Sequence, residues 1–404
     1  MRTSRTLNCI TPPHLLDRLV QSDDLQIRDA AIRTMVASAE LRGERTSRPS
    51  LAAMATPTQG RRTIFDARQR ESLQRAEIVR TETAPVSTDS TVNRAFDGLG
   101  ITRQFFADVF DRDSIDGQGM RLDGYVHFGY RFNNAFWDGL HMVFGDGDGN
   151  MFTDFTKSLD VIGHELAHGV TETTAGLVYH KQPGALNESI SDVFGSLIRQ
   201  YSLKQTAETA DWLIGAEIFT PAFDGDALRS MKDPGKAYDN PTMGQDPQPG
   251  HMNDFVQLPD TARGDWGGVH VNSGIPNKAF YLTALNIGGY AWEAPGHIWY
   301  ESLKASTSTT QFQEFAETTA AKAAQLYGTT EQQAVVDAWE QVGIRVRAQA
   351  PAGLTPDGSA SVQALQAQIE KLSADVRALL REVRGGEASA VKPTASNRQK
   401  VTVD

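Results

Sequence analysis

Two histidines four residues apart, His164 and His168, stand in the stretch GHELAHG, with Glu165 beside the first of them. In an α-helix, residues at this spacing project from one face, so both imidazoles could present a ring nitrogen to one metal ion. Glu165, one residue further round, would lie beside the ion rather than on it. The motif is typical of a catalytic zinc site. The competing interpretation is a surface helix that carries two histidines by chance.

A catalytic zinc site needs three protein ligands and one open position, and the downstream stretch GALNESISDVFG offers a third ligand. Glu188 follows His168 at a distance that allows a turn and a second helix to return to the first. Asp192 lies one helical turn beyond Glu188, where its carboxylate could hold a ligand imidazole by the second nitrogen. Apolar residues around this pair predict a buried helix, in which carboxylates need partners.

The composition sets limits on what the chain can be. It has 404 residues, of which 40% are hydrophobic and 22% charged, as expected for two or three globular units. The formal net charge of -11 gives no reason to expect a nucleic acid partner. No apolar run reaches the roughly 18 residues that a membrane span needs. Without a signal peptide and with Cys9 as its only cysteine, the chain is expected to be cytoplasmic at synthesis, non-classical secretion being left open.

The pattern of residues divides the chain into four parts. Residues 1–60 predict helices followed by a linker, and residues 61–160 predict strands, with turn signals at AFDGLG, SIDGQG and FGDGDG. Helical patterns dominate residues 161–345, interrupted by a long loop at 233–266. Residues 346–404 read as a linker, a heptad helix and a disordered tail.

Several motifs occur in one order within a match from about Arg61 to Gly343, and together they make the chain similar to a known family. They include FNNAFWDG, SLDVIGHELAHGVTETTAGLVY, GALNESISDVFG and GGVHVNSGIPNKAFYL. The chain resembles the thermolysin-like zinc endopeptidases, and within them the protealysin-like branch. The resemblance implies an α+β fold of two lobes. A β-rich N-terminal lobe would join a helical C-terminal lobe, with the metal-binding helix at the floor of the cleft between them.

The resemblance also implies one catalytic zinc ion and the roles of the residues around it. The residues implied to bind zinc are His164, His168 and Glu188, and those implied to hold the zinc histidines are Asp192 and Asn187. Glu165 would be the general base in the hydrolysis of protein or peptide substrates. The residues implied to stabilise the oxyanion are Tyr179 and His270, with Asp265 orienting His270.

Substrate recognition is implied in the same way. Asn134 and the Ala135 carbonyl would pair with the substrate main chain, and Arg229 would hold a substrate carbonyl. The pocket beyond the scissile bond would be lined by Phe152, Val161 and Leu228. These apolar side chains predict a preference for a bulky apolar residue directly after the cleaved bond. A small protein inhibitor is a further candidate partner.

The family commonly carries a double calcium site, and this sequence departs from it. Asp160 and Asp211 match two of its ligands, whereas the residues at three other ligand positions are Arg199, Leu213 and Ala216. Calcium needs about six to eight oxygen ligands, so the double site is not expected to survive. The Arg199 guanidinium could replace a calcium charge by pairing with either aspartate.

Two other stretches bear on calcium. A separate calcium position near Thr220 and Asp226 is left open. The stretch FGDGDGN looks superficially like a calcium loop, but Met151 stands where the glycine of such a loop belongs. A β-turn is therefore the favoured interpretation.

The short N-terminal segment ITPPHLL resembles a Pro-Pro motif of the protealysin-like branch, which implies an inhibitory prosegment. Pro12 and Pro13 would stiffen an extended segment that lies in the cleft. Two hypotheses remain for the inhibition. The Cys9 thiolate could be the fourth zinc ligand, or Cys9 could be a small packed residue while the prolines alone block the cleft. Removal of the prosegment is expected between about residues 45 and 62.

The stretch 361–384 lies outside the resemblance. Its apolar residues alternate at spacings of three and four from Val362 to Val383, as in a coiled-coil seam. It either self-associates or packs on its own catalytic lobe. Two rival functions for the whole chain follow from these features. They are a catalytically dead, peptidase-like binding protein, and a scaffolding protein that acts through this tail.

Overall fold

The computed structural model describes residues 8–47 and 61–346, except for the side chains of residues 8 and 44–47. The described residues fall within one compact unit, Met1–Ala348. The heptad helix predicted at 361–384 lies outside the described residues, so self-association and packing on the catalytic lobe both stay predictions. The four domain boundaries stay predictions as well.

The N-terminal segment forms a short strand and two helices, β1 (Asn8–Cys9), α1 (Pro13–Leu19) and α2 (Leu25–Ser47). Asp24 caps α2, since its Oδ1 accepts hydrogen bonds from the amides of Gln26 and Ile27 at the start of that helix. Both prolines were predicted to lie in an extended segment, and this is correct for Pro12 but wrong for Pro13. Pro12 is extended, but Pro13 begins α1, where its fixed φ and missing N–H suit the first helical position.

A mixed sheet of six strands builds the N-terminal lobe, as predicted. Its order is β1-β5-β6-β4-β2-β3, and its other members are β2 (Arg62–Asp66), β3 (Glu77–Thr81), β4 (Leu122–Val126), β5 (Ala135–Trp137) and β6 (His141–Phe144). The pairs β2–β4 and β4–β6 are parallel, and the other neighbours are antiparallel. The N-terminal strand β1 therefore forms one edge of the sheet of this lobe.

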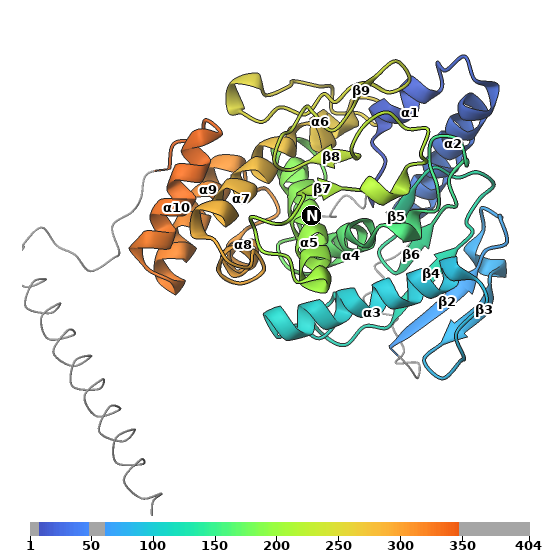
Figure 1. The fold of residues 1–404 in the computed structure, drawn as a ribbon, viewed down its shortest axis with the longest axis horizontal. Helices are drawn as coiled ribbons and strands as arrows, with labels where there is room; N and C mark the ends of the chain where they lie inside the picture. The colour runs from blue at the N-terminus through green and yellow to red at the C-terminus, as the bar shows by residue number, and fades with distance from the viewer. Residues whose placement is uncertain (1–7, 48–60, 347–404) are drawn as a thin grey trace, which may run out of the picture. The chain divides into compact units, whose positions relative to one another are not determined.

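Helix α3 (Ser90–Phe110) lies in a region where only strands and turns were predicted. It packs along β2, β3 and β4 (Figure 1). The turn signal AFDGLG, residues 95–100, is therefore wrong because it falls inside this helix. A β-carbon at Gly98 would lie 2.4 Å from Ile162 Cδ1. The glycine is there for close packing of α3 on the next helix, not for a turn.

The C-terminal lobe is helical, as predicted. Its helices are α4 (Leu159–Thr173), α5 (Lys181–Leu203), α6 (Asp265–Asn272), α7 (Gly274–Ile287), α8 (Ala294–Ala305), α9 (Phe312–Leu326) and α10 (Thr329–Gln341). Short strands lie between α5 and α6, namely β7 (Leu213–Ile214), β8 (Arg229–Ser230), β9 (Asp239–Asn240) and β10 (Gly244–Gln245). The short 3-10 helices are η2 (Leu73–Arg75), η3 (Phe155–Lys157), η4 (Ala216–Ile218) and η5 (Met252–Asp254). None of the described helices is long and apolar enough to cross a membrane.

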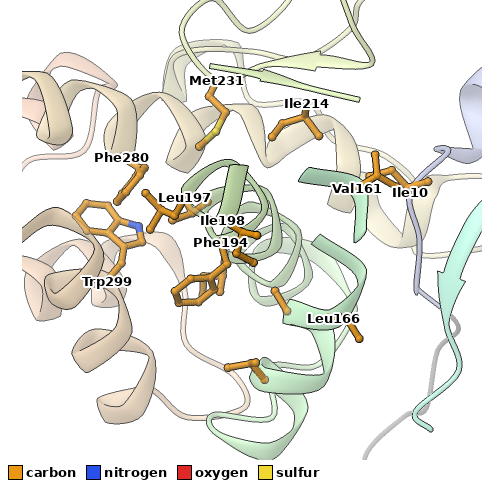
Figure 2. Packing of buried hydrophobic residues seen from close by; sticks show 14 of the residues in the cluster. Ile10, Val161, Leu166, Phe194, Leu197, Ile198, Ile214, Met231, Phe280 and Trp299 are labelled. Atoms are coloured by element: carbon orange, nitrogen blue, oxygen red, sulfur yellow. The ribbon is translucent and has the colours of Figure 1, made fainter. Parts of the chain in front are cut away.

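Helix α5 lies at the centre of the core. Phe194, Leu197 and Ile198 are buried on it and pack between α4 and the later helices (Figure 2). Two glycines let α4 and α5 approach closely. A β-carbon at Gly195 would lie 2.4 Å from the Asp160 carbonyl oxygen, and one at Gly163 would lie 2.7 Å from Ile198 Cδ1. This contact fixes the two helices that carry the candidate metal ligands.

Candidate metal centre

The structure brings together the three residues predicted to bind zinc. His164 and His168 from α4 and Glu188 from α5 are buried, and their ligand atoms all lie within 4.8 Å of one another. The two Nε2 atoms are 3.1 Å apart, and each lies 3.5 Å from an oxygen of Glu188. Glu188 Oε2 has no hydrogen-bond partner among the described residues. Two imidazoles and one carboxylate form a donor set that suits catalytic zinc.

The Nδ1 atoms of both histidines face the two residues that the resemblance implied would hold them. His164 Nδ1 lies 2.8 Å from Asp192 Oδ1, and His168 Nδ1 lies 2.8 Å from Asn187 Oδ1. Ser191 Oγ lies 3.0 Å from the same atom of His168, a contact that was not predicted. With Nδ1 engaged, each ring turns its Nε2 toward the common centre.

Asp192 is itself held by two residues from other elements. Arg229 donates to both of its oxygens at 2.9 and 2.8 Å, and Asn277 Nδ2 donates to Oδ2 at 2.8 Å. Burial alone would raise the pKa of Asp192, but Arg229 and His164 hold it well below the usual range. Asn277 lies far along the chain, and only its place in the fold identifies it. Arg229 was predicted as a substrate contact alone and also has this structural contact.

Glu165 faces the same centre from the side. Its Oε2 accepts a hydrogen bond from the Trp137 amide at 3.0 Å, and its Oε1 has no partner among the described residues. Burial and, next, the charge of Glu188 raise the pKa of Glu165 well above its usual value. A buried carboxylate of this kind suits proton transfer. The Trp137 contact was not predicted, since it arises from the approach of β5 to α4.

Tyr179 and His270 lie together on the other side of the centre. The Tyr179 hydroxyl donates to Glu188 Oε1 and lies 3.2 Å from His270 Nε2. Asp265 Oδ1 lies 2.5 Å from His270 Nδ1, and Oδ2 accepts from the His270 amide. Burial would lower the pKa of His270, but Glu188 and Asp265 raise it to about 9. Asp265 thus has the orienting position that the resemblance implied.

The main chain of the N-terminal segment, residues 9–11, contacts each position predicted to bind substrate. The Ile10 amide donates to the Ala135 carbonyl at 3.2 Å. The Thr11 amide donates to Asn134 Oδ1 at 3.0 Å. Arg229 Nη1 donates to the Ile10 carbonyl at 3.2 Å.

One further contact comes from Cys9, whose carbonyl oxygen lies 3.1 Å from His270 Nε2. The cluster of possible ligand atoms among the described residues does not include the Cys9 sulfur. The arrangement therefore gives no support to the thiolate hypothesis. It is the main chain of Cys9 that reaches the site.

The side chain of Ile10 is fully buried in the main hydrophobic cluster. It lies next to Val161 (Figure 2), and the same cluster contains Phe152 and Leu228, the other residues of the predicted pocket. Phe152, Val161 and Leu228 are thus buried in one cluster with Ile10, and a specificity pocket formed by these residues stays a prediction.

The carboxylates considered for a double calcium site are paired with the side chain of Arg199. Arg199 donates to both oxygens of Asp211 and to Glu217 Oε1, and its Nε lies 4.0 Å from Asp160 Oδ2. The predicted pairing of Arg199 is therefore present, whereas its replacement of calcium stays a prediction. Burial raises the pKa of Asp160 to about 7, with the charge of Glu217 adding to the shift.

The FGDGDGN loop and the second calcium position also have internal partners. Asp148 Oδ1 accepts from the amides of Asn150, Met151 and Phe152, so this carboxylate closes its own turn. Thr220 Oγ1 donates to the Asn150 carbonyl. Calcium near Thr220 and Asp226 stays a prediction.

Comparison with known proteins matches two family models to the chain. Residues 45–172 match the catalytic domain of thermolysin metallopeptidases, and residues 175–344 match their α-helical domain. The chain is 46% identical to an extracellular metalloprotease of Pectobacterium carotovorum subsp. carotovorum, covering 85% of this chain and 98% of that protein. It is 44% identical to Protease PrtS of Photorhabdus sp. strain Az29, covering 84% and 92%.

Among solved structures, the precursor of protealysin, a metalloproteinase from Serratia proteamaculans, matches with a TM-score of 0.75 and 46% identity. The match covers 83% of this chain and 99% of that one. The sequence identity, the shared fold and the buried cluster of two histidines and a glutamate agree with one another. The chain therefore belongs to the thermolysin family of metallopeptidases and is a zinc metalloendopeptidase that acts on protein substrates.

Proposed function

We propose that this endopeptidase is made as a self-inhibited zymogen. The observation that carries the proposal is that residues 9–11 satisfy the main-chain contacts expected of a substrate. The Ala135 carbonyl, Asn134 and Arg229 cannot bind another peptide while they bind this one. The similarity to a structure described as the precursor of protealysin supports the same proposal.

We propose the following roles for the chain's own residues. When bound by His164, His168 and Glu188, zinc supplies Lewis acidity toward the substrate carbonyl and the attacking water. Glu165 takes a proton from that water and passes it to the leaving amine.

Groups on the opposite side stabilise charge on the carbonyl oxygen. Tyr179 and His270 donate hydrogen bonds to this oxygen as it becomes negative. Asp265 holds His270 by Nδ1, so that Nε2 carries a proton toward the substrate. Arg229 holds the carbonyl of the residue after the scissile bond, and Asp192 keeps its guanidinium in place.

The pocket around Ile10 supports a preference for a bulky apolar residue directly after the scissile bond. Its lining of Phe152, Val161 and Leu228 is apolar and buried, so a charged side chain would lose its hydration there without a partner. Cleavage of a peptide library is expected to enrich Leu, Ile, Phe or Val at this position. A profile dominated by acidic residues would contradict the preference.

The central test compares the parent enzyme, after removal of residues 1–60, with a Glu165→Gln variant that an added protease has cut at the same place. Both are expected to bind one zinc ion per chain, because Glu165 is not in the ligand cluster. Peptide hydrolysis should fall by about 10²- to 10⁴-fold in the variant. Glu172→Gln, at the exposed end of the same helix, is the matched control and should keep full activity. Zinc binding without peptidase activity in the parent would favour the rival binding protein.

Latency is tested by following the full-length chain as it ages. Activity should rise as a new N-terminus appears between about residues 45 and 62. Cys9→Ser should leave the initial latency unchanged, because the contact at the site comes from the Cys9 carbonyl. Full activity in a freshly purified, uncut chain would refute the zymogen. A loss of latency in the serine variant alone would restore the thiolate hypothesis.

A further inference from the structure

The prosegment crosses the site in the direction and register of a substrate. Strand β1 pairs antiparallel with β5, with Cys9 opposite Phe136. From N- to C-terminus, the chain meets the oxyanion donor His270, then the Ala135 carbonyl, then Arg229 and last Asn134. A segment running the opposite way could block the cleft, but it would not meet these groups in this order.

The register brings one particular peptide bond to the catalytic groups. The Cys9 carbonyl lies at His270 Nε2, and the next amide, that of Ile10, donates to the Ala135 carbonyl. The same amide also has a hydrogen-bond contact with the Glu165 carboxylate. The carbonyl thus faces the oxyanion donor, while the nitrogen faces the group that would protonate a leaving amine.

We infer that the Cys9–Ile10 peptide bond is held as a scissile bond and that the enzyme hydrolyses it within its own chain. The inference rests on the proposed function. One water molecule is consumed and the C–N bond breaks. The water oxygen joins the Cys9 carbonyl carbon to form a new carboxylate. Glu165 carries the two protons of the water, one after the other, to the Ile10 nitrogen, which leaves as an ammonium group.

This cut differs from the one that removes the prosegment. It detaches residues 1–9 and leaves α1 and α2 attached to the catalytic lobe. Ile10, Leu15 and Leu19 are fully buried in the main core cluster, so they keep the new Ile10 amine at the site. A product held in this way blocks water and favours rejoining of the bond. We therefore expect the reaction to be slow and the cut chain to stay latent.

The cavity beside Cys9 gives the departing segment room. It has a volume of about 210 Å³, and its lining includes Cys9, Tyr179, Trp266 and His270. Cys9, before the bond, thus borders open space, whereas Ile10, after the bond, is fully buried and is not among the residues that line this cavity.

The test follows the zinc-loaded full-length chain by intact mass spectrometry at several protein concentrations. A species that begins at Ile10 should form with a first-order rate constant that does not depend on the protein concentration. It should be absent from Glu165→Gln. Ile10→Asp should abolish this species, because the carboxylate would be buried in the apolar pocket. Thr11→Val is the matched control. Its side chain is buried and its hydroxyl has no partner among the described residues, so the cut should persist.

A synthetic peptide of residues 4–16, SRTLNCITPPHLL, covers the case in which Ile10→Asp simply releases the prosegment. The processed enzyme should cut this peptide between Cys9 and Ile10. The inference is overturned if the enzyme hydrolyses reference peptides while this bond stays intact in both the full chain and the peptide. If no peptide of any kind is cut, the proposed function itself has failed.

Discussion

At the scale of single residues, His14 makes the free energy with which the prosegment docks on the catalytic lobe depend on pH. Its Nδ1 is buried without a partner among the described residues, and its Nε2 lies 3.4 Å from the Tyr238 hydroxyl. Burial lowers the pKa of His14 to about 4, with Arg229 and His270 adding to the effect and Asp265 opposing it. A docked imidazole is therefore neutral near neutral pH, whereas a free one titrates near 6.5.

The sign of the pH effect follows from this depressed pKa. Docking is fully favourable above about pH 6.5 and weakens as the pH falls toward 4, by about 2 kcal/mol near pH 5. Hydrogen exchange of the α1 amides in the inactive Glu165→Gln chain would measure it. Protection should fall between pH 7 and 5, and a further His14→Gln substitution should flatten the response. A parent chain with constant protection over this range would contradict the assignment.

At the scale of elements, Arg199 joins α5 to the loop that follows it. Its guanidinium contacts Asp211 and Glu217 and lies near Asp160. Arg199→Met would leave three carboxylates close together without their cation. We expect a loss of about 2 kcal/mol, since the pairs are only partly shielded from solvent.

The effect of added calcium on the melting temperature tests whether Arg199 replaces a calcium ion in this cluster. In the parent chain, calcium should not change the melting temperature, because Arg199 already neutralises the carboxylates. In Arg199→Met, added calcium should recover part of the lost stability, measured by thermal unfolding in the inactive Glu165→Gln background. A large rise in the melting temperature of the parent on adding calcium would show that the Arg199 guanidinium does not replace the charge of a calcium ion.

The elements also show what sequence could and could not predict. Helical spacing correctly placed His164, His168, Glu188 and Asp192 together, because each pair lies on one helix face. It missed α3, where glycines needed for close packing were read as a turn. It also missed Trp137 and Asn277, which reach the site only through the fold. Ser191 was missed too, although it follows Asn187 by one turn of the same helix and contacts the same nitrogen of His168.

At the scale of the whole molecule, the prosegment is part of the hydrophobic core. Ile10, Leu15 and Leu19 belong to the same buried cluster as the helices of the catalytic lobe, and each fully buried residue of this kind contributes about 1.5–3 kcal/mol. The uncut Glu165→Gln chain should therefore unfold at a higher temperature than the processed enzyme with zinc bound. If the uncut chain melted at the same temperature as the processed enzyme or at a lower one, the prosegment would block the cleft without contributing to the stability of the core.

The edge position of β1 has a consequence for the enzyme after the prosegment leaves. The next strand, β5, then becomes the border of the sheet, with unpaired main-chain groups facing the cleft. Such a border binds any chain that can lie flat against it, largely without regard to sequence. A folded target protein must therefore first unfold locally, so that one of its segments can pair with β5 in an extended conformation. Loops and loosened termini of target proteins are therefore the expected points of cleavage.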